Sequence, residues 1–268
     1  AIYFLREFAR DFGTLNIKDF TKQDFISLTN GILLEGTKTK ANRVFTHVKT
    51  FFNWCIGQGY IDWNPCDYVK KPFDEQSRER FLSDAEIRYF WQATESDLEP
   101  FGYLYRMMLL TGQRKNECAK MTADEIVEGN HWHLRSERTK NKSQHDIFLP
   151  RQALRIVQRN SRVDGSFIFS TTGSGPVNGL SKPTTRLRSK MNEIAGCKLE
   201  HWQPHDLRRT LETNLAKLKT PQDLIDRIVN HKSGAITKMN RTYNQWEYRE
   251  EKEAALQRWA DHVEALVA

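Results

Sequence analysis

Apolar positions in the first part of the chain recur at the spacing of short helices. Thr21 and Asp24 stand three residues apart, as in a capping box, and predict that a helix begins there. A longer amphipathic helix is expected after Thr37, where several apolar residues share one face: Phe45, Val48, Phe52 and Cys55. Two glycines, at positions 57 and 59, are expected to end it. The pattern predicts a helical first domain over residues 1–72.

The next segment, "KPFDEQSRER", is polar and charged, which is typical of an exposed interdomain linker. We assign the linker to residues 73–81 and a second domain to residues 82–268. Ser83 and Glu86 form another capping box, and Leu82 and Ile87 are placed as a hydrophobic staple, so a helix is expected to begin there.

A small sheet is expected in the middle of the second domain. The apolar segment "YLYRMMLLTG" predicts a helix that ends at Gly112, whereas "HWHLRS" and "HDIFLP" alternate like strands and are joined by the polar turn "ERTKNKSQ". The segment "SFIFS" is a further strand candidate, and the remainder follows helical spacing. The predicted fold class is mainly α with a small antiparallel β-sheet (α+β).

Composition adds little to this fold but limits the class of protein. The chain is 38% hydrophobic and 28% charged, as in ordinary globular proteins. It has neither the roughly 20 consecutive apolar residues of a membrane span nor the order of residues found in a signal peptide. We expect an intracellular, cytoplasmic protein with no membrane partner. Because the sequence begins with Ala1 inside a helical pattern, we also expect it to start within a longer protein.

The four cysteines indicate no metal site and no disulfide framework. They stand far apart and form no CxxC spacing: Cys55, Cys66, Cys118 and Cys197. We expect all four to be packing residues, and neither a metal nor another cofactor is predicted.

Net charge points weakly to a polyanionic partner. The chain has 41 Lys and Arg against 34 Asp and Glu, a formal charge of +7. Basic side chains that contact phosphates release bound counterions, so a basic protein is suited to nucleic acid. Many basic proteins bind none, and charge alone does not decide the matter.

The motif "TGQRKNE" is the first candidate for chemistry. Arg114 opens a helix there and Glu117 lies three residues later on the same face, so the carboxylate can orient the guanidinium. An ordinary surface ion pair would have the same spacing.

The second motif, "HDLRRT", places His205 and Arg208 three residues apart just after Pro204, which suits the first turn of a helix. On one face they can meet the same phosphate, because an arginine fork matches two oxygens and a histidine can donate to a third or move a proton. A half-buried histidine beside solvated arginines is the alternative.

The third motif, "VNHKSG" followed by "RTYNQWEY", places His231 twelve residues before Tyr243. Singly, such residues are more often capping or packing residues. In order, however, Arg114, a hairpin lysine, the HxxR pair, His231 and a tyrosine resemble the signature of the tyrosine recombinases of the phage and genomic-island integrase kind. The stretch "TKANRVFTHVKTFFNWCIGQGYIDWNPCDYVKKP" resembles the last helices of that family's core-binding domain.

The resemblance implies a set of roles. Arg114 and Arg208 would clamp the phosphate, His205 and His231 would be the paired histidines, and Tyr243 would be the nucleophile, with Glu117 in support. Lys140 would be the hairpin lysine that protonates the leaving oxygen. Two alternatives stay open: Lys142 in place of Lys140, and Tyr248 in place of Tyr243.

The resemblance also implies partners. These are double-stranded DNA attachment sites, a homotetramer that forms when two sites are paired, and accessory DNA-bending and excision factors. The DNA would belong to a prophage or genomic island, and the protein would work at the nucleoid of a bacterial host. A type IB topoisomerase shares the chemistry without a partner site, and an inactive DNA-binding relative would retain only binding.

Further basic residues are candidates for DNA contact. One group opens the long helix of the first domain: Lys38, Lys40 and Arg43. The other occupies a nine-residue stretch inside the second domain: Lys182, Arg186, Arg188 and Lys190. Each group would equally suit a solvated face.

The end of the chain carries an apolar stripe at helical spacing, made of Leu256, Trp259 and Val263. The stripe can pack on its own domain. The family resemblance suggests instead that it docks onto a neighbouring protomer and couples active sites within the tetramer.

Overall fold

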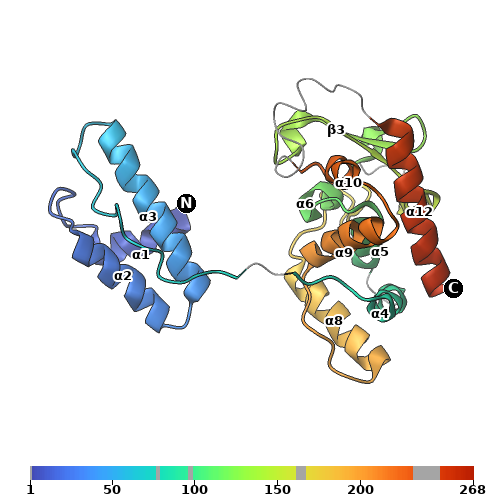
Figure 1. The fold of residues 1–268 in the computed structure, drawn as a ribbon, viewed down its shortest axis with the longest axis horizontal. Coiled ribbons are helices and arrows are strands. Elements are labelled where there is room, and N and C mark those ends of the chain that lie inside the picture. Colours follow the sequence, from blue (N-terminus) through green and yellow to red (C-terminus); the bar gives the residue numbers. More distant parts are fainter. Residues whose placement is uncertain (1, 77–78, 96–98, 161–166, 232–247) are drawn as a thin grey trace. The chain divides into compact units, whose positions relative to one another are not determined.

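In the computed structural model the chain divides into two compact units, residues 1–78 and 79–268 (Figure 1). The structure describes residues 2–76, 79–95, 99–160, 167–231 and 248–268. Each unit has its own hydrophobic core, so each is described separately.

The described part of the first unit is helical, as predicted. Its helices are α1 (Ile2–Phe12), α2 (Lys22–Leu34) and α3 (Lys38–Gly57). The capping box at the start of α2 is present, with Thr21 Oγ1 accepting from the Asp24 amide at 3.2 Å. Apolar side chains from all three helices meet in an aromatic core, in which the Phe20 and Phe52 rings stack at 5.0 Å. Asn42 on α3 donates to the carbonyl of Phe73 at 2.7 Å and so holds the chain that leaves this unit.

Helices dominate the second unit. In the described residues of this unit they are α4 (Asp84–Thr94), α5 (Phe101–Thr111), α6 (Lys115–Ala119), α7 (Arg151–Asn160), α8 (Ser181–Ala195), α9 (Pro204–Lys217), α10 (Gln222–Ile228) and α12 (Arg249–Val267). Helix α5 lies inside, against α4, α7, α9 and α12 (Figure 1). The predicted capping box of Ser83 and Glu86 is present at the start of α4.

Gly112 ends α5 and lets it approach α9 closely. Its φ of 66° is left-handed, a conformation that costs glycine little. A Cβ at this position would lie 3.0 Å from a methyl group of Leu211 on α9. This close approach brings the start of α6 to the side of α9, which places Arg114 near Arg208.

Three strands in the described part of this unit form an antiparallel sheet in the order β1 (Ile126–Val127), β2 (His131–Leu134), β3 (His145–Phe148). The predicted hairpin of β2 and β3 is confirmed, with Trp132 opposite Ile147. Strand β1 was not predicted, because two residues carry no periodic signal. The strand expected at "SFIFS" is wrong in its described part, where only an isolated bridge joins Phe167 to Thr122.

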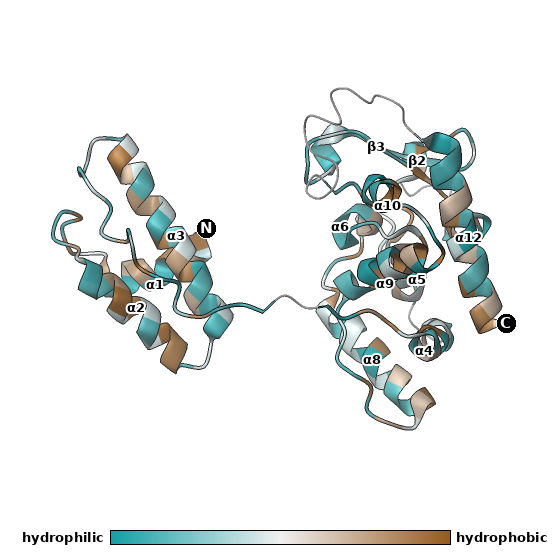
Figure 2. Ribbon diagram, viewed as in Figure 1, coloured by the Kyte–Doolittle hydropathy of each residue, from teal (hydrophilic) through white to brown (hydrophobic). Residues whose placement is uncertain are grey.

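The apolar stripe of α12 packs into the core of its own unit. Leu256, Trp259 and Val263 are 1%, 0% and 0% exposed, and Trp259 Nε1 donates to the Leu109 carbonyl on α5 at 2.9 Å. Ala255 and Ala260 are buried beside them, and hydrophilic residues fill most of the remaining positions of the helix before its C-terminal end (Figure 2). The suggestion that the stripe docks onto a neighbouring protomer is therefore wrong, since the side chains already have partners.

Replacement of Trp259 by alanine is expected to destabilise the second unit by about 3–5 kcal/mol, because it leaves a cavity in the core and an unpaired carbonyl on α5. Urea unfolding followed by circular dichroism measures the loss. Trp63→Ala, at a tryptophan that is 62% exposed in the first unit, is the control and should change stability by less than about 0.5 kcal/mol. Equal stability of the two variants would contradict a core role for α12.

The cysteines follow the prediction with one correction. Cys55, Cys66 and Cys118 are buried, and burial raises the pKa of the Cys66 thiol to about 12. Cys197 is exposed, just after α8, and is not a packing residue. Among the described helices, none combines the length and apolar character that crossing a bilayer requires.

Candidate active site

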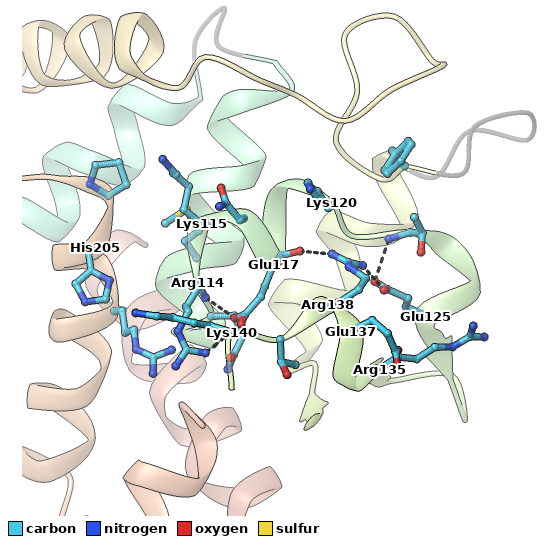
Figure 3. A pocket seen from close by; sticks show the side chains of 18 of the residues that line it. Arg114, Lys115, Glu117, Lys120, Glu125, Arg135, Glu137, Arg138, Lys140 and His205 are labelled. Atoms are coloured by element: carbon cyan, nitrogen blue, oxygen red, sulfur yellow. Dashed lines mark hydrogen bonds and ion pairs between the residues drawn. The ribbon is translucent and has the colours of Figure 1, made fainter. Parts of the chain in front are cut away.

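A cavity of about 1150 Å³ in the second unit gathers most of the predicted catalytic residues. Its wall is formed by α6, by the turn between β2 and β3, and by the start of α9. Five of the residues that line it were singled out from the sequence: Arg114, Glu117, Lys140, His205 and Arg208. Figure 3 shows Arg114, Lys140 and His205 at one side of this cavity and the pair of Arg138 and Glu125 at the other.

Arg114 is held from behind by Glu117. It is the N-cap residue of α6, where its amide donates to one carboxylate oxygen of Glu117 at 2.9 Å and its Nη1 to the other at 3.0 Å. Its Nη2 donates to the Asn230 carbonyl at 3.2 Å. The Glu117 side chain is only 4% exposed, so the pair is more constrained than a surface ion pair.

Arg208 lies at the bottom of the site and is 2% exposed. Its Nη1 donates to the Gly112 carbonyl at 3.0 Å, its Nη2 to the Val229 carbonyl, and its Nε to Glu212 Oε1 at 3.2 Å. Burial, and then the charge of Arg114, lower the pKa of Arg208 to about 10. The guanidinium is thus still charged at neutral pH and fixed on three sides.

His205 stands in the first turn of α9, one residue after Pro204, as the sequence suggests. Partial burial lowers the pKa of its imidazole, and the positive charges of Arg208 and Arg209 lower it further. At neutral pH the ring is therefore predominantly uncharged and able to accept a proton.

His231 follows α10 and lies between two carboxylates. Its Nε2 is 3.6 Å from Glu212 Oε1 and its Nδ1 is 3.8 Å from Asp226 Oδ1. Burial, and then Arg208, lower the pKa of His231, whereas the two carboxylates act in the opposite sense. Glu212 therefore lies between His231 and Arg208, since its Oε1 also accepts from Arg208 Nε.

Lys140 and Lys142 differ in their placement on the hairpin turn. Lys140 lines the cavity. Lys142 has a left-handed φ of 50° and its amide closes a turn onto the Thr139 carbonyl at 3.1 Å. Between them, Asn141 donates to the Asn230 carbonyl at 2.7 Å, which ties the turn to the segment before His231.

The carbonyls at the end of α10 connect these elements. Helix ends leave carbonyls without intrahelical partners and carry partial negative charge. The Ile228 carbonyl accepts from Gln113 and from His145, each at 3.0 Å. The Val229 carbonyl accepts from Arg208, and the Asn230 carbonyl accepts from Arg114 and Asn141. Burial lowers the pKa of His145 to about 3, so this ring is neutral and donates its N–H.

Arg138 supports the opposite wall of the cavity. Its Nη1 pairs with Glu125, and its Nη2 donates to the Glu117 carbonyl in α6 at 3.0 Å. Sequence reasoning missed Arg138, Asn141 and Glu212. Of these, only Glu212 carried a usable signal, because it stands four residues after Arg208 on the same helix.

Comparison with known proteins identifies the family. Residues 80–249 match the profile of the Phage integrase family. The chain belongs to this family. It is 22% identical over 233 residues to the integrases of Enterobacteria phage 434 and Escherichia phage lambda, which covers 84% of this chain and 64% of each relative. It is 23% identical over 260 residues to the prophage integrase IntA of Escherichia coli K12, covering 94% of this chain and 61% of that relative. The chain thus spans less than two thirds of these relatives.

Solved structures of integrases share the fold. A lambda integrase dimer bound to a COC′ core site superposes with a TM-score of 0.68 at 20% identity, covering 88% of this chain and 90% of that one. The Tn1549 transposon integrase in complex with circular intermediate DNA gives 0.67 at 18% identity, covering 94% and 90%. The predicted fold class, mainly α with a small antiparallel sheet, is confirmed.

The predicted nucleophile lies outside the described residues, since Tyr243 falls in the segment 232–247. The alternative residue, Tyr248, is described. It has a left-handed φ of 50° as the N-cap of α12, and the Arg227 guanidinium lies over its ring, 4.6 Å from the centroid. Its ring thus contacts the end of α10.

The predicted DNA-contact residues differ in what their side chains contact. Lys182 and Arg186 are exposed on one face of α8, whereas Arg188 donates to the Trp202 carbonyl at 3.2 Å and Lys190 is half-buried. In the first unit, Lys40 pairs with Glu7 at 2.9 Å, Lys38 lies over the Phe73 ring, and Arg43 is exposed. Their contact with DNA stays a prediction.

No group of three or more His, Cys, Asp or Glu side chains suited to a metal occurs among the residues that the structure describes.

Proposed function

We propose that this chain is the DNA-binding and catalytic part of a site-specific recombinase that cleaves and rejoins DNA through a 3′-phosphotyrosyl link to Tyr243. The observation that carries the proposal is the convergence of Arg114, Arg208, Lys140 and His205 on one cavity, in a member of the phage integrase family. These are the donors and the proton acceptor that attack on a phosphodiester requires.

The two arginines stabilise the transition state. Attack by an oxygen on a phosphodiester increases the negative charge on its equatorial oxygens, and fixed cations are therefore the main catalytic need. Arg114 and Arg208 are held by backbone carbonyls and carboxylates before any substrate arrives, so little reorganisation is needed. His231 donates a further hydrogen bond to the same phosphate.

The proton transfers use His205 and Lys140. The phenol of Tyr243 must lose its proton as its oxygen bonds to phosphorus, and the neutral His205 accepts it. The bond from phosphorus to the 5′-oxygen breaks at the same time, and Lys140 protonates that oxygen. A 5′-hydroxyl from another strand then reverses these steps, which rejoins the DNA without a nucleotide or a metal.

The proposal extends to partners. Related integrases have been solved on DNA core sites, and one structure is a lambda integrase tetramer bound to a Holliday junction. We propose double-stranded attachment sites of a prophage or genomic island, a homotetramer on two paired sites, accessory bending and excision factors, and a cytoplasmic location at the nucleoid. Residues 1–72 would be the core-binding domain, with Arg43 there and Lys182 and Arg186 on α8 as phosphate contacts.

Nicked duplexes that carry the junction sequences of the mobile element next to the gene provide the test. Cleavage releases a short 5′-hydroxyl strand, which traps the covalent complex. We expect a protein–DNA adduct on denaturing gels, formed equally in excess EDTA, and exchange of strands between two differently labelled junction duplexes. Adduct formation without exchange would favour a topoisomerase-like enzyme. Loss of the adduct in EDTA with rescue by magnesium would contradict the mechanism.

A further inference from the structure

Glu212 lies between the second arginine and the second histidine of the site. Its Oε1 accepts a hydrogen bond from Arg208 Nε at 3.2 Å and lies 3.6 Å from His231 Nε2. Arg208 and Glu212 are four residues apart on α9 and leave the same face of the helix. His231 reaches the same oxygen from the end of α10. The chemistry proposed above does not use this carboxylate.

The contact with Arg208 is more than an exposed ion pair. The Arg208 side chain is 2% exposed and that of Glu212 is 24% exposed, so the pair is largely withdrawn from water. A guanidinium has five N–H groups. One N–H group on each Nη donates to a main-chain carbonyl, and the N–H on Nε donates to Glu212. The second N–H group on each Nη is then left for phosphate oxygens. Glu212 therefore supplies, with the Gly112 and Val229 carbonyls, the third contact that fixes the rotation of the fork.

The contact with His231 concerns its proton. A neutral imidazole carries one proton, on either nitrogen: Glu212, 3.6 Å from Nε2, favours a proton there, whereas Asp226, slightly farther from Nδ1 at 3.8 Å, favours the other tautomer. The Glu212 carboxylate also favours the charged ring, as does Asp226 on the Nδ1 side, whereas burial, Arg208 and Arg114 act against it. At 3.6 Å the Glu212 oxygen is beyond hydrogen-bond distance, so it attracts the proton on Nε2 electrostatically while a non-bridging phosphate oxygen can accept the N–H.

We propose that Glu212 is a positioning residue that aligns Arg208 and His231 as a pair of donors to one phosphate. The carboxylate acts through both partners: it holds the arginine fork at a fixed angle and keeps a proton on the nitrogen of the histidine that faces the arginine. The inference rests on the proposed recombinase function and adds a residue to its machinery.

Single-turnover adduct formation on the nicked duplex is the first test. We expect Glu212→Ala to slow cleavage on the order of 10-fold to 100-fold, by analogy with the groups that orient metal ligands from behind. Glu212→Gln keeps an acceptor oxygen and should lose less. On a His231→Ala background, Glu212→Ala should have a clearly smaller effect, because part of its action passes through the missing ring. Equal effects on both backgrounds would overturn the role through His231.

An NMR titration of the His231 ring in the DNA-free protein is the second test, and it does not depend on cleavage. Glu212→Gln removes the charge that favours the protonated ring, so the pKa of His231 should fall. Glu250→Gln, at an exposed glutamate in the first turn of α12, makes the same charge change and should leave the titration unaltered. Thermal melting verifies that each variant is folded.

The outcomes separate the two proposals. If the wild-type protein forms no adduct, the recombinase function fails, while a lowered His231 pKa in Glu212→Gln would still support the placement of the carboxylate. If the wild-type protein cleaves but Glu212→Gln and Glu250→Gln behave alike in both tests, Glu212 is an ordinary ion pair and the inference is wrong.

Discussion

Tyr243→Phe is expected to abolish covalent attachment to nicked junction DNA. The substitution removes only the phenolic oxygen, the atom that would bond to phosphorus, and a phenyl ring offers no other nucleophile. DNA affinity should be retained, because it depends on the basic residues that neutralise phosphates. Denaturing gels measure the adduct, and gel shifts in the same buffer measure binding.

Tyr248→Phe is the matched control, five residues away in the same tail. Tyr248 is the N-cap of α12, and its ring contacts Arg227, a contact that a phenyl ring can keep. We therefore expect Tyr248→Phe to form adduct at nearly the wild-type level. The reverse pattern, with Tyr248 essential and Tyr243 dispensable, would show that the alignment of the tail is displaced by five residues.

Local sequence signals predicted the elements of this fold well. Each capping box is encoded by two side chains three residues apart, so Thr21 with Asp24 and Ser83 with Glu86 could be found without any tertiary information. Periodicity failed where a strand was too short to show it, as in β1. It also showed the apolar face of α12 without showing that α5, which is distant in sequence, covers that face.

The candidate site was predictable in its residue types but not in what holds them. Arg114 with Glu117, and His205 with Arg208, are neighbours on single helices, and their spacing is visible in the chain. The acceptors that fix the two arginines are largely main-chain carbonyls, at Gly112, Val229 and Asn230. A carbonyl belongs to every residue and leaves no trace in the sequence, so only the packing of α5, α9 and α10 shows which ones act.

Lys140→Ala is expected to slow cleavage of ordinary DNA by about 10²–10⁴-fold, the contribution usual for a general acid, with little change in binding. The alkoxide that leaves from the 5′ position is a poor leaving group unless it is protonated. Lys140 lines the cavity beside Arg114, whereas Lys142 has its backbone in the turn and is not among the described residues of the cavity wall. Lys142→Ala should therefore be mild.

A substrate with sulfur in place of the bridging 5′-oxygen decides whether Lys140 delivers the proton. A thiolate leaves readily without protonation, so Lys140→Ala should cleave this substrate nearly as fast as the unmodified enzyme does. Arg114→Ala loses charge stabilisation at the equatorial oxygens, worth about 10²–10³-fold for one donor, and sulfur at the bridging position should not restore it. If Lys142→Ala is the defective variant and sulfur rescues it, the general acid is Lys142, two residues further along the hairpin. If sulfur rescues neither lysine variant, the hairpin positions the phosphate and the proton comes from another group.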